Sequence, residues 1–240
     1  MAEEFTFREC FTEFLGILCI VYFGGWSVIL YTNDIIFVTD VAFIHAFIYG
    51  VMIWCGSAHS KCQFNPAITV SSLLVKQMNQ LNALYNIISQ FLGCYMGALM
   101  IYYTVPEILY ISAKEAGAEI GCPHLNDKYN WIQGMVLEML VSFVLAFVYF
   151  SLQSHEGTTS AFPLGFCLGF AILCIGNITG GSVNPFRYLG PALLSLNLHD
   201  VHVYVIGPMI GAIAAAYLYI NLFDEKKNVK AKPLPSENPV

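Results

Sequence analysis

Long stretches without charged residues dominate this sequence and limit the folds that it can adopt. Only 11% of its residues are charged and 57% are hydrophobic, whereas soluble domains carry about 25% charged residues. A helix that crosses a bilayer needs about 20 predominantly apolar residues. The runs that meet this requirement, interrupted only by Glu138, are Phe14–Asn33, Val41–Ser60, Gln77–Pro106, Tyr129–His155, Gly157–Phe186 and Val201–Phe223. The sequence therefore predicts an all-α membrane protein with six transmembrane helices.

Two further apolar segments, Pro66–Val75 and Pro185–Leu196, are too short to cross a membrane. Each follows an asparagine, Asn65 or Asn184, and begins with proline. Asparagine is favoured as the cap of a helix and proline at its first position, so each Asn-Pro step predicts the start of a short helix. Two such re-entrant half-helices, entering from opposite faces, would meet at the bilayer midplane with their N-termini together.

The same order of features occurs twice along the chain. Glu13 opens the first run and Glu138 lies early in the fourth, while the Asn-Pro steps follow the second and fifth runs. This order implies two halves of three spans each, about residues 13–106 and 129–223. Because three is odd, the halves must have opposite orientations, the inverted repeat of many transport proteins. We expect a channel domain over residues 13–223, between a cytoplasmic N-terminus (1–12) and a cytoplasmic tail (224–240).

Lysine and arginine positions predict the orientation of the spans. With the N-terminus in the cytoplasm, the inner segments hold Arg8, Lys61, Lys76, Lys226, Lys227, Lys230 and Lys232. The outer connections hold Lys114 and Lys128. Since cytoplasmic loops carry the excess of positive charge, we expect both termini in the cytoplasm, in the plasma membrane or an intracellular membrane.

Glycines recur four residues apart in three of the runs, at Gly93 and Gly97, Gly165 and Gly169, and Gly207 and Gly211. Such small-residue stripes let helices approach closely in lipid. We interpret them as contacts within one subunit.

The paired helix starts predict the electrostatics of the midplane. Each helix N-terminus is equivalent to roughly half an elementary charge, so a cavity between two of them would repel cations and hydronium. The side-chain amides of Asn65 and Asn184 have N–H donors that would attract the oxygen of a passing water. That orientation interrupts a proton-conducting chain of waters while water itself still moves.

From Glu13 to Tyr219 the chain resembles the aquaporin (major intrinsic protein) family. The signature step is present as Asn65-Pro66-Ala67, and the segment "GGSVNPFRYLGPAL", with Pro185 and Phe186, is similar to the second signature. The segments "SQFLGCYMGA", "FPLGFCLGFAI" and "YVIGPMIGAIAAAYLY" are similar to the third, fifth and sixth spans of the family. The resemblance implies a passive water channel that excludes protons and ions and forms a homotetramer with one pore per subunit.

The resemblance also implies an outer constriction formed by His45, Ile172, Gly181 and Arg187. Arg187 would hydrogen-bond permeating water and repel cations; the alternative is an arginine that reaches out to anchor the lipid interface. The combination is similar to that of ammonia-permeable members, so we expect ammonia or other small neutral solutes to pass besides water. His45 could instead be a buried polar residue bonded to a neighbouring helix.

The two signature regions depart from the family pattern. Phe186 replaces the usual alanine, as a packing adjustment or as a pore plug, and Lys61-Cys62-Gln63 replaces the usual Gly-small-His. Lys61 is either a solvated cytoplasmic charge or a gate. Cys62 lies three residues before Asn65 and is a possible mercurial site.

Glutamates at the positions of Glu13 and Glu138 accept hydrogen bonds from the re-entrant loops in the family. We therefore expect these two residues to support the loops and not to relay protons.

The alternative functions are a proton-coupled secondary transporter and a non-conducting scaffold relative. Buried carboxylates are consistent with the first, and Phe186 is consistent with the second. The sequence shows no nucleophile–base pair and no metal-ligand spacing, so it predicts no enzyme, metal site or cofactor. The expected partners are water, small neutral solutes and the lipid bilayer, without nucleic acid.

Overall fold

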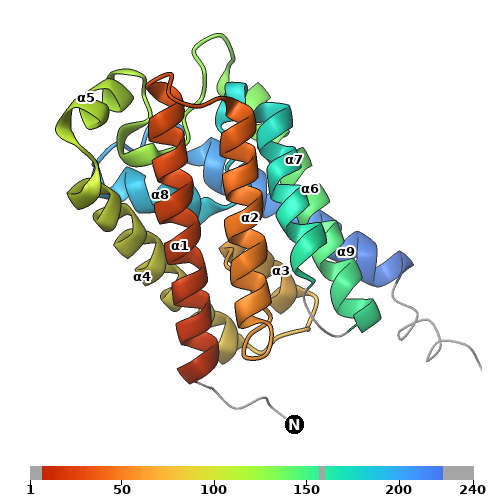
Figure 1. The fold of residues 1–240 in the computed structure, drawn as a ribbon. Coiled ribbons are helices and arrows are strands. Elements are labelled where there is room, and N and C mark those ends of the chain that lie inside the picture. Colours follow the sequence, from red (N-terminus) through yellow and green to blue (C-terminus); the bar gives the residue numbers. More distant parts are fainter. Residues whose placement is uncertain (1–6, 157–159, 224–240) are drawn as a thin grey trace, which may run out of the picture.

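A computed structural model describes residues 7–156 and 160–223, in which helices and loops are present and no strand occurs (Figure 1). The elements are α1 (Phe7–Thr32), α2 (Val38–Gly56), α3 (Pro66–Leu74), α4 (Gln80–Thr104), α5 (Glu107–Glu115), the 3-10 turn η1 (Glu119–Gly121), α6 (Trp131–Glu156), α7 (Ala161–Thr179), α8 (Pro185–Leu194) and α9 (Val201–Leu222). Among the described residues, six helices are long and apolar enough to cross a membrane: α1, α2, α4, α6, α7 and α9. The predicted fold class is confirmed, with α3 and α8 as the two half-helices. The expected tail, residues 224–240, lies outside the described residues.

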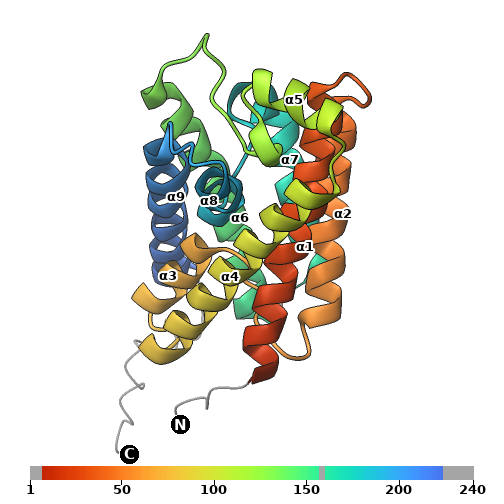
Figure 2. The ribbon, with the colours of Figure 1, turned by 90° about the vertical axis from the view of Figure 1, so that its left-hand side faces the viewer.

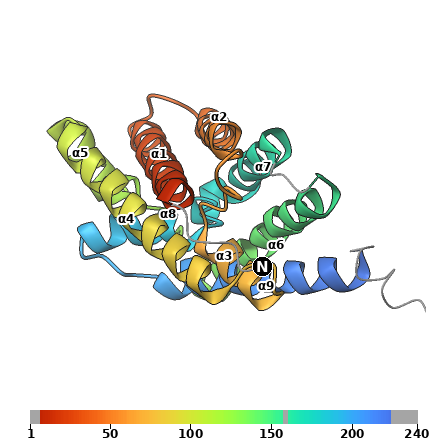
Figure 3. The same cartoon turned by 90° about the horizontal axis from the view of Figure 1, so that it is seen from below.

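The half-helices enter the bundle from opposite ends. Figure 2 shows α8 toward the end that carries α5, which is the predicted outer side, and α3 toward the end where α1 begins and α9 ends. Viewed along the bundle, α1, α2 and α7 lie along one side, while α8 overlaps α4 and α3 overlaps α9 on the other side (Figure 3). The contacts repeat with the halves exchanged: α1 packs on α4 as α6 packs on α9, and α8 packs on α4 as α3 packs on α9. This exchange is the inverted repeat.

The glycine stripes lie in contacts between helices of the same subunit, as predicted. A methyl group added to Gly93 of α4 would lie 2.3 Å from the backbone oxygen of Phe14 in α1. One added to Gly211 of α9 would lie 2.1 Å from the backbone oxygen of Met139 in α6. These distances are shorter than any non-bonded contact, so glycine is required where these helix pairs cross.

Two boundaries differ from the apolar runs. α1 begins at Phe7, before the first run, because a helix can extend beyond the hydrocarbon core into the headgroup region, where charged residues such as Arg8 and Glu9 are tolerated. α7 ends at Thr179, and Gly180 has a φ of 82°, in the left-handed region that commonly ends helices. Residues 180–184 are a non-helical approach to α8. An uncharged run in the sequence can therefore contain both a spanning helix and a buried loop, and the absence of charge does not show where the helix ends.

The outer connection between the halves contains α5 and η1, which the sequence analysis did not predict. The Lys114 ammonium lies 2.9 Å from the Glu119 carboxylate, and the Tyr110 hydroxyl donates to the same oxygen at 2.5 Å. These contacts link α5 to η1 next to the outer loop.

Candidate functional site

The two asparagines of the Asn-Pro steps cap the half-helices. The side-chain oxygen of Asn65 accepts a hydrogen bond from the backbone N–H of Ala67 at 2.9 Å. The side-chain oxygen of Asn184 accepts one from the backbone N–H of Phe186, also at 2.9 Å. Both asparagines have extended backbone, and Pro66 or Pro185 follows as the first helical residue. Each amide oxygen thus serves its own helix, and the amide nitrogen points away from it.

Each amide nitrogen binds the opposite half of the molecule. The Nδ2 of Asn65 donates to the backbone oxygen of Val183 at 2.9 Å, and the Nδ2 of Asn184 donates to the backbone oxygen of Phe64 at 2.7 Å. A side-chain amide has two N–H groups, so one on each asparagine is left for a passing molecule. The sequence predicts that these donors bind water, whereas half of them tie the two re-entrant loops together.

The residues directly before the two asparagines have the same unusual backbone. Phe64 has a φ of 48° and Val183 a φ of 58°, uncommon for any residue except glycine and strained for a β-branched one. In this conformation their carbonyl groups reach the asparagine of the opposite half.

Glu13 of α1 accepts four hydrogen bonds around the first loop. Its Oε1 accepts from the Ser60 hydroxyl at 2.5 Å and from the backbone N–H of Gln63 at 2.9 Å. Its Oε2 accepts from the backbone N–H of Phe64 and from the side-chain amide of Gln90, both at 2.7 Å. The carboxylate therefore holds the backbone at the strained residue Phe64.

Glu138 of α6 does the same for the second loop. It accepts hydrogen bonds from the Thr179 hydroxyl at 2.6 Å and from the backbone N–H groups of Ser182 at 2.9 Å and Val183 at 2.7 Å. Both glutamates are fully buried. Gln90 and Thr179 belong to this support but are not part of a sequence motif, which is why the sequence analysis missed them.

The residues expected at the outer constriction lie together. One terminal nitrogen of Arg187, Nη1, donates to the backbone oxygens of Gly181 at 2.6 Å and Ser182 at 2.9 Å. The other, Nη2, lies 2.8 Å from the Nε2 of His45. Arg187 is 5% exposed and its guanidinium is held by the protein interior, so it does not anchor the lipid interface.

Ile172 and a glycine of α1 lie against the other residues expected at the constriction. A methyl group on Gly181, whose φ is 56°, would lie 3.1 Å from the Cα of Ile172, so these two residues are in close contact. A methyl group on Gly24 would lie 2.4 Å from the Nε2 of His45. Gly24 therefore makes room for the imidazole, and no local sequence signal distinguishes it from the other glycines of the spans.

A small cavity is lined by Arg187 and both asparagines. Its volume is about 10 Å³, which is room for about one water molecule. Its lining comes from both halves: Ile20, Tyr49, Asn65, Leu145, Leu168, Ser182, Val183, Asn184 and Arg187. The cavity is polar where the loops meet and apolar where the spans face it.

Phe186 does not line this cavity. Its ring is 7% exposed and packs edge-on against Phe91 of α4, with 5.9 Å between the ring centroids. This position agrees with the packing interpretation of Phe186 and not with a plug.

The residues that depart from the family pattern before Asn65 make local contacts. Lys61 donates through Nζ to the backbone oxygen of Gln77 at 3.0 Å. Cys62 is fully buried, with its sulfur 3.7 Å from the backbone oxygen of Ile53. The amide of Gln63 accepts from Thr69 at 2.8 Å and donates to Ser72 at 3.1 Å. All three side chains are thus tied to neighbouring helices or loops.

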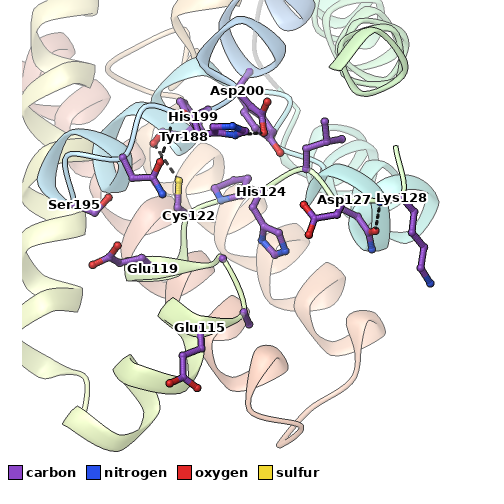
Figure 4. A pocket seen from close by; sticks show the side chains of 17 residues that line it. Glu115, Glu119, Cys122, His124, Asp127, Lys128, Tyr188, Ser195, His199 and Asp200 are labelled. Carbon is purple, nitrogen blue, oxygen red and sulfur yellow. Dashed lines mark hydrogen bonds and ion pairs between the residues drawn. The ribbon is translucent and has the colours of Figure 1, made fainter. Parts of the chain in front are cut away.

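A larger cavity of about 510 Å³ lies beside the outer loop and the C-terminal end of α8 (Figure 4). Acidic side chains line it, including Glu119, Asp127 and Asp200. Burial lowers the pKa of His124 in this cavity, although nearby Asp127 raises it. Within the described ranges, no group of three or more His, Cys, Asp or Glu residues could hold a metal ion.

Known proteins that are similar to this chain are aquaporins and an aquaglyceroporin. Residues 2–219 match the family described as Major intrinsic protein. Aquaporin A of Dictyostelium discoideum is 32% identical over 95% of this chain and 82% of its own length. Aquaporin-5 of Homo sapiens is 28% identical over 90% of this chain and 80% of its own. The X-ray structure of the aquaglyceroporin from Plasmodium falciparum has the same fold, with a TM-score of 0.75 and 18% identity over 92% of this chain and 98% of that one.

Proposed function

This chain belongs to the major intrinsic protein family, and we propose that it is a passive water channel that excludes protons and ions and also passes ammonia. Family membership supports a multi-pass membrane channel for water or small solutes, and the aquaporins that it resembles are channels and not enzymes. The proposed selectivity against protons and ions, and for ammonia, is inferred from the contacts around Asn65, Asn184 and Arg187.

The reciprocal hydrogen bonds of Asn65 and Asn184 are the observation on which the proposal rests. These bonds fix the side-chain amides of both asparagines. The remaining N–H of each amide is therefore already oriented when a water arrives. A water that accepts from both must point its hydrogens away, which interrupts proton transfer along a file of waters. The N-termini of α3 and α8 add a positive potential at the same depth.

Arg187 supplies a second barrier in this proposal. Its guanidinium is always charged and is fixed by Gly181, Ser182 and His45. A cation would have to pass this charge in a narrow passage and exchange its own water shell for very few ligands. Water can instead accept a hydrogen bond from the guanidinium and move on.

Ammonia passage is proposed from the shape of the constriction. Gly181 has no side chain, and His45 presents an imidazole where a larger apolar ring would narrow the passage. Ile172, 1% exposed, provides an apolar wall. Neutral ammonia is close to water in size and can accept a hydrogen bond from Arg187.

We further propose the arrangement of the whole protein. Glu13 and Glu138 support the loops and relay no protons, because each carboxylate is occupied by loop and helix donors. The channel domain covers residues 13–223, both termini lie in the cytoplasm, and subunits form a homotetramer with one pore each, in the plasma membrane or an intracellular membrane.

Stopped-flow light scattering on proteoliposomes tests the proposal, with water, ammonia, glycerol and hydrogen peroxide as permeants and a trapped pH dye for protons. We expect water and ammonia flux above that of protein-free vesicles, without proton current. Flux that saturates or follows a proton gradient would establish the transporter alternative. No osmotic water flux from correctly folded protein would favour the scaffold alternative.

A further inference from the structure

Tyr49 of α2 lies one helical turn inward from His45. Residues four apart lie on the same face of a helix, and Tyr49 lines the small cavity together with Asn65 and Asn184. Its ring packs edge-on against Phe64, with 6.2 Å between the centroids. Tyr49 therefore continues the face of α2 that begins at the outer constriction, at the depth of the asparagines.

The hydroxyl of Tyr49 has no hydrogen-bond partner among the described residues, although it is completely buried. The Tyr49 ring lies against Phe64, the residue before Asn65 in the first loop. An unpaired buried hydroxyl is unfavourable, and a water in an adjoining polar space is the usual way to satisfy it.

Tyr149 of α6 approaches the same region from the other half of the molecule. It lies one turn inward from Leu145, which lines the cavity, and it is 1% exposed. Its hydroxyl donates to the backbone oxygen of Lys61, in the loop that leads to Asn65, at 3.4 Å. Tyr49 contacts the same loop through Phe64.

We propose that Tyr49 and Tyr149 form an inner narrow section of the pore, where the Tyr49 hydroxyl holds a permeating water and the Tyr149 ring limits solute size. The inference rests on the proposed channel function and adds a specificity-determining pair to it. Water leaving the asparagines meets the Tyr49 hydroxyl as its next hydrogen-bonding partner. The Tyr149 ring is fixed by the loop that leads to Asn65, so it cannot move aside without breaking its hydrogen bond to Lys61.

Two variants test the two tyrosines separately: one should lower water permeability and the other should admit a larger solute. Tyr49→Phe removes the hydroxyl and keeps the ring, and should lower water permeability about fivefold, the effect of losing one ordinary hydrogen bond. Tyr149→Leu removes the ring and should make the channel permeable to urea, which the wild type should exclude. Phe150→Leu is the matched control, because Phe150 is as buried as Tyr149 and is the next residue of α6, so it points about 100° around the helix from Tyr149. It also has no hydroxyl that could bond to the loop before Asn65 as Tyr149 does.

Both permeabilities are measured in proteoliposomes containing equal amounts of folded protein, verified by gel filtration and circular dichroism. Suppose that the wild type conducts water, and that both tyrosine variants have the same water and urea permeabilities as the wild type and Phe150→Leu. The inference is then wrong, while the channel function stands. If Phe150→Leu admits urea as readily as Tyr149→Leu, the inference is also wrong. If the wild type and every variant remain at the rate of empty vesicles, both the inference and the channel function fail.

Discussion

The imidazole of His45 and the guanidinium of Arg187 share a hydrogen bond of 2.8 Å. A guanidinium can only donate, so the Nε2 of His45 is the acceptor. The other ring nitrogen, Nδ1, lies 2.9 Å from the backbone oxygen of Val41 and must carry the ring proton to donate to it. His45 is therefore a neutral imidazole with both nitrogens engaged, and the donors offered to a passing molecule come from Arg187.

Replacing His45 with phenylalanine should reduce ammonia permeability much more than water permeability. The larger apolar ring narrows the constriction and leaves Nη2 of Arg187 without its acceptor. The measurement is the ratio of the two permeabilities in matched proteoliposomes. An unchanged ratio would mean that His45 does not shape the passage, and the ammonia proposal would reduce to water conduction alone.

Gly24→Ala should alter the same ratio without replacing any polar residue. The added methyl group would lie 2.4 Å from the Nε2 of His45 and must displace the imidazole from Arg187. Gly25→Ala is the matched control, since its methyl group would meet the end of the flexible Ile101 side chain, also at 2.4 Å. Equal behaviour of the two variants in ammonia and water assays would argue against a role of Gly24 at the constriction.

Arg187→Val should admit cations or protons, because it removes the only charge of the constriction. Arg187→Lys is the comparison: it keeps the charge but cannot satisfy Gly181, Ser182 and His45 with one planar group. We expect proton leak, read from a trapped pH dye, to be large for valine and smaller for lysine. Wild-type selectivity in the valine variant would remove Arg187 from the barrier.

Glu13→Gln should destabilise the protein and leave conduction independent of a proton gradient. Glutamine keeps one acceptor oxygen, so its NH₂ group faces donors that Glu13 now satisfies. Each buried donor left unpaired costs about 1–3 kcal/mol, which should lower the melting temperature, and Glu138→Gln should act similarly. The assay compares uptake with and without an imposed proton gradient. Gradient-driven uptake in the wild type that is uncoupled in Glu13→Gln would establish a transporter.

Membrane-permeant mercurials should inhibit through Cys62. The thiol is buried against α2, so we expect slow inhibition that requires local opening of the loop before Asn65. Cys62→Ser should conduct normally and lose the inhibition, whereas Cys174→Ser, with an exposed thiol on α7, should retain it. Full inhibition that persists in Cys62→Ser would shift the site to Cys174.

The sequence by itself determined the number of spans, the two half-helices and their inverted relation. These features follow from local physics: an uncharged run of sufficient length must be a helix in lipid, because no water satisfies its backbone. Asn-Pro steps start helices through cap geometry that needs no distant contact. The role of the glutamates and the residues expected at the constriction come instead from the resemblance to the aquaporin family, by counting along its matched motifs.

The tertiary structure decided where side chains point and what they bind. A spanning helix is apolar toward lipid and toward its neighbours alike, so hydrophobic periodicity does not reveal which face of α2 carries Tyr49 or which way Phe186 turns. The bonds from Asn65 to Val183 and from Asn184 to Phe64 join residues far apart in the chain. They exist only because the two inverted halves bring their strained loops to the same depth, which no local sequence pattern encodes.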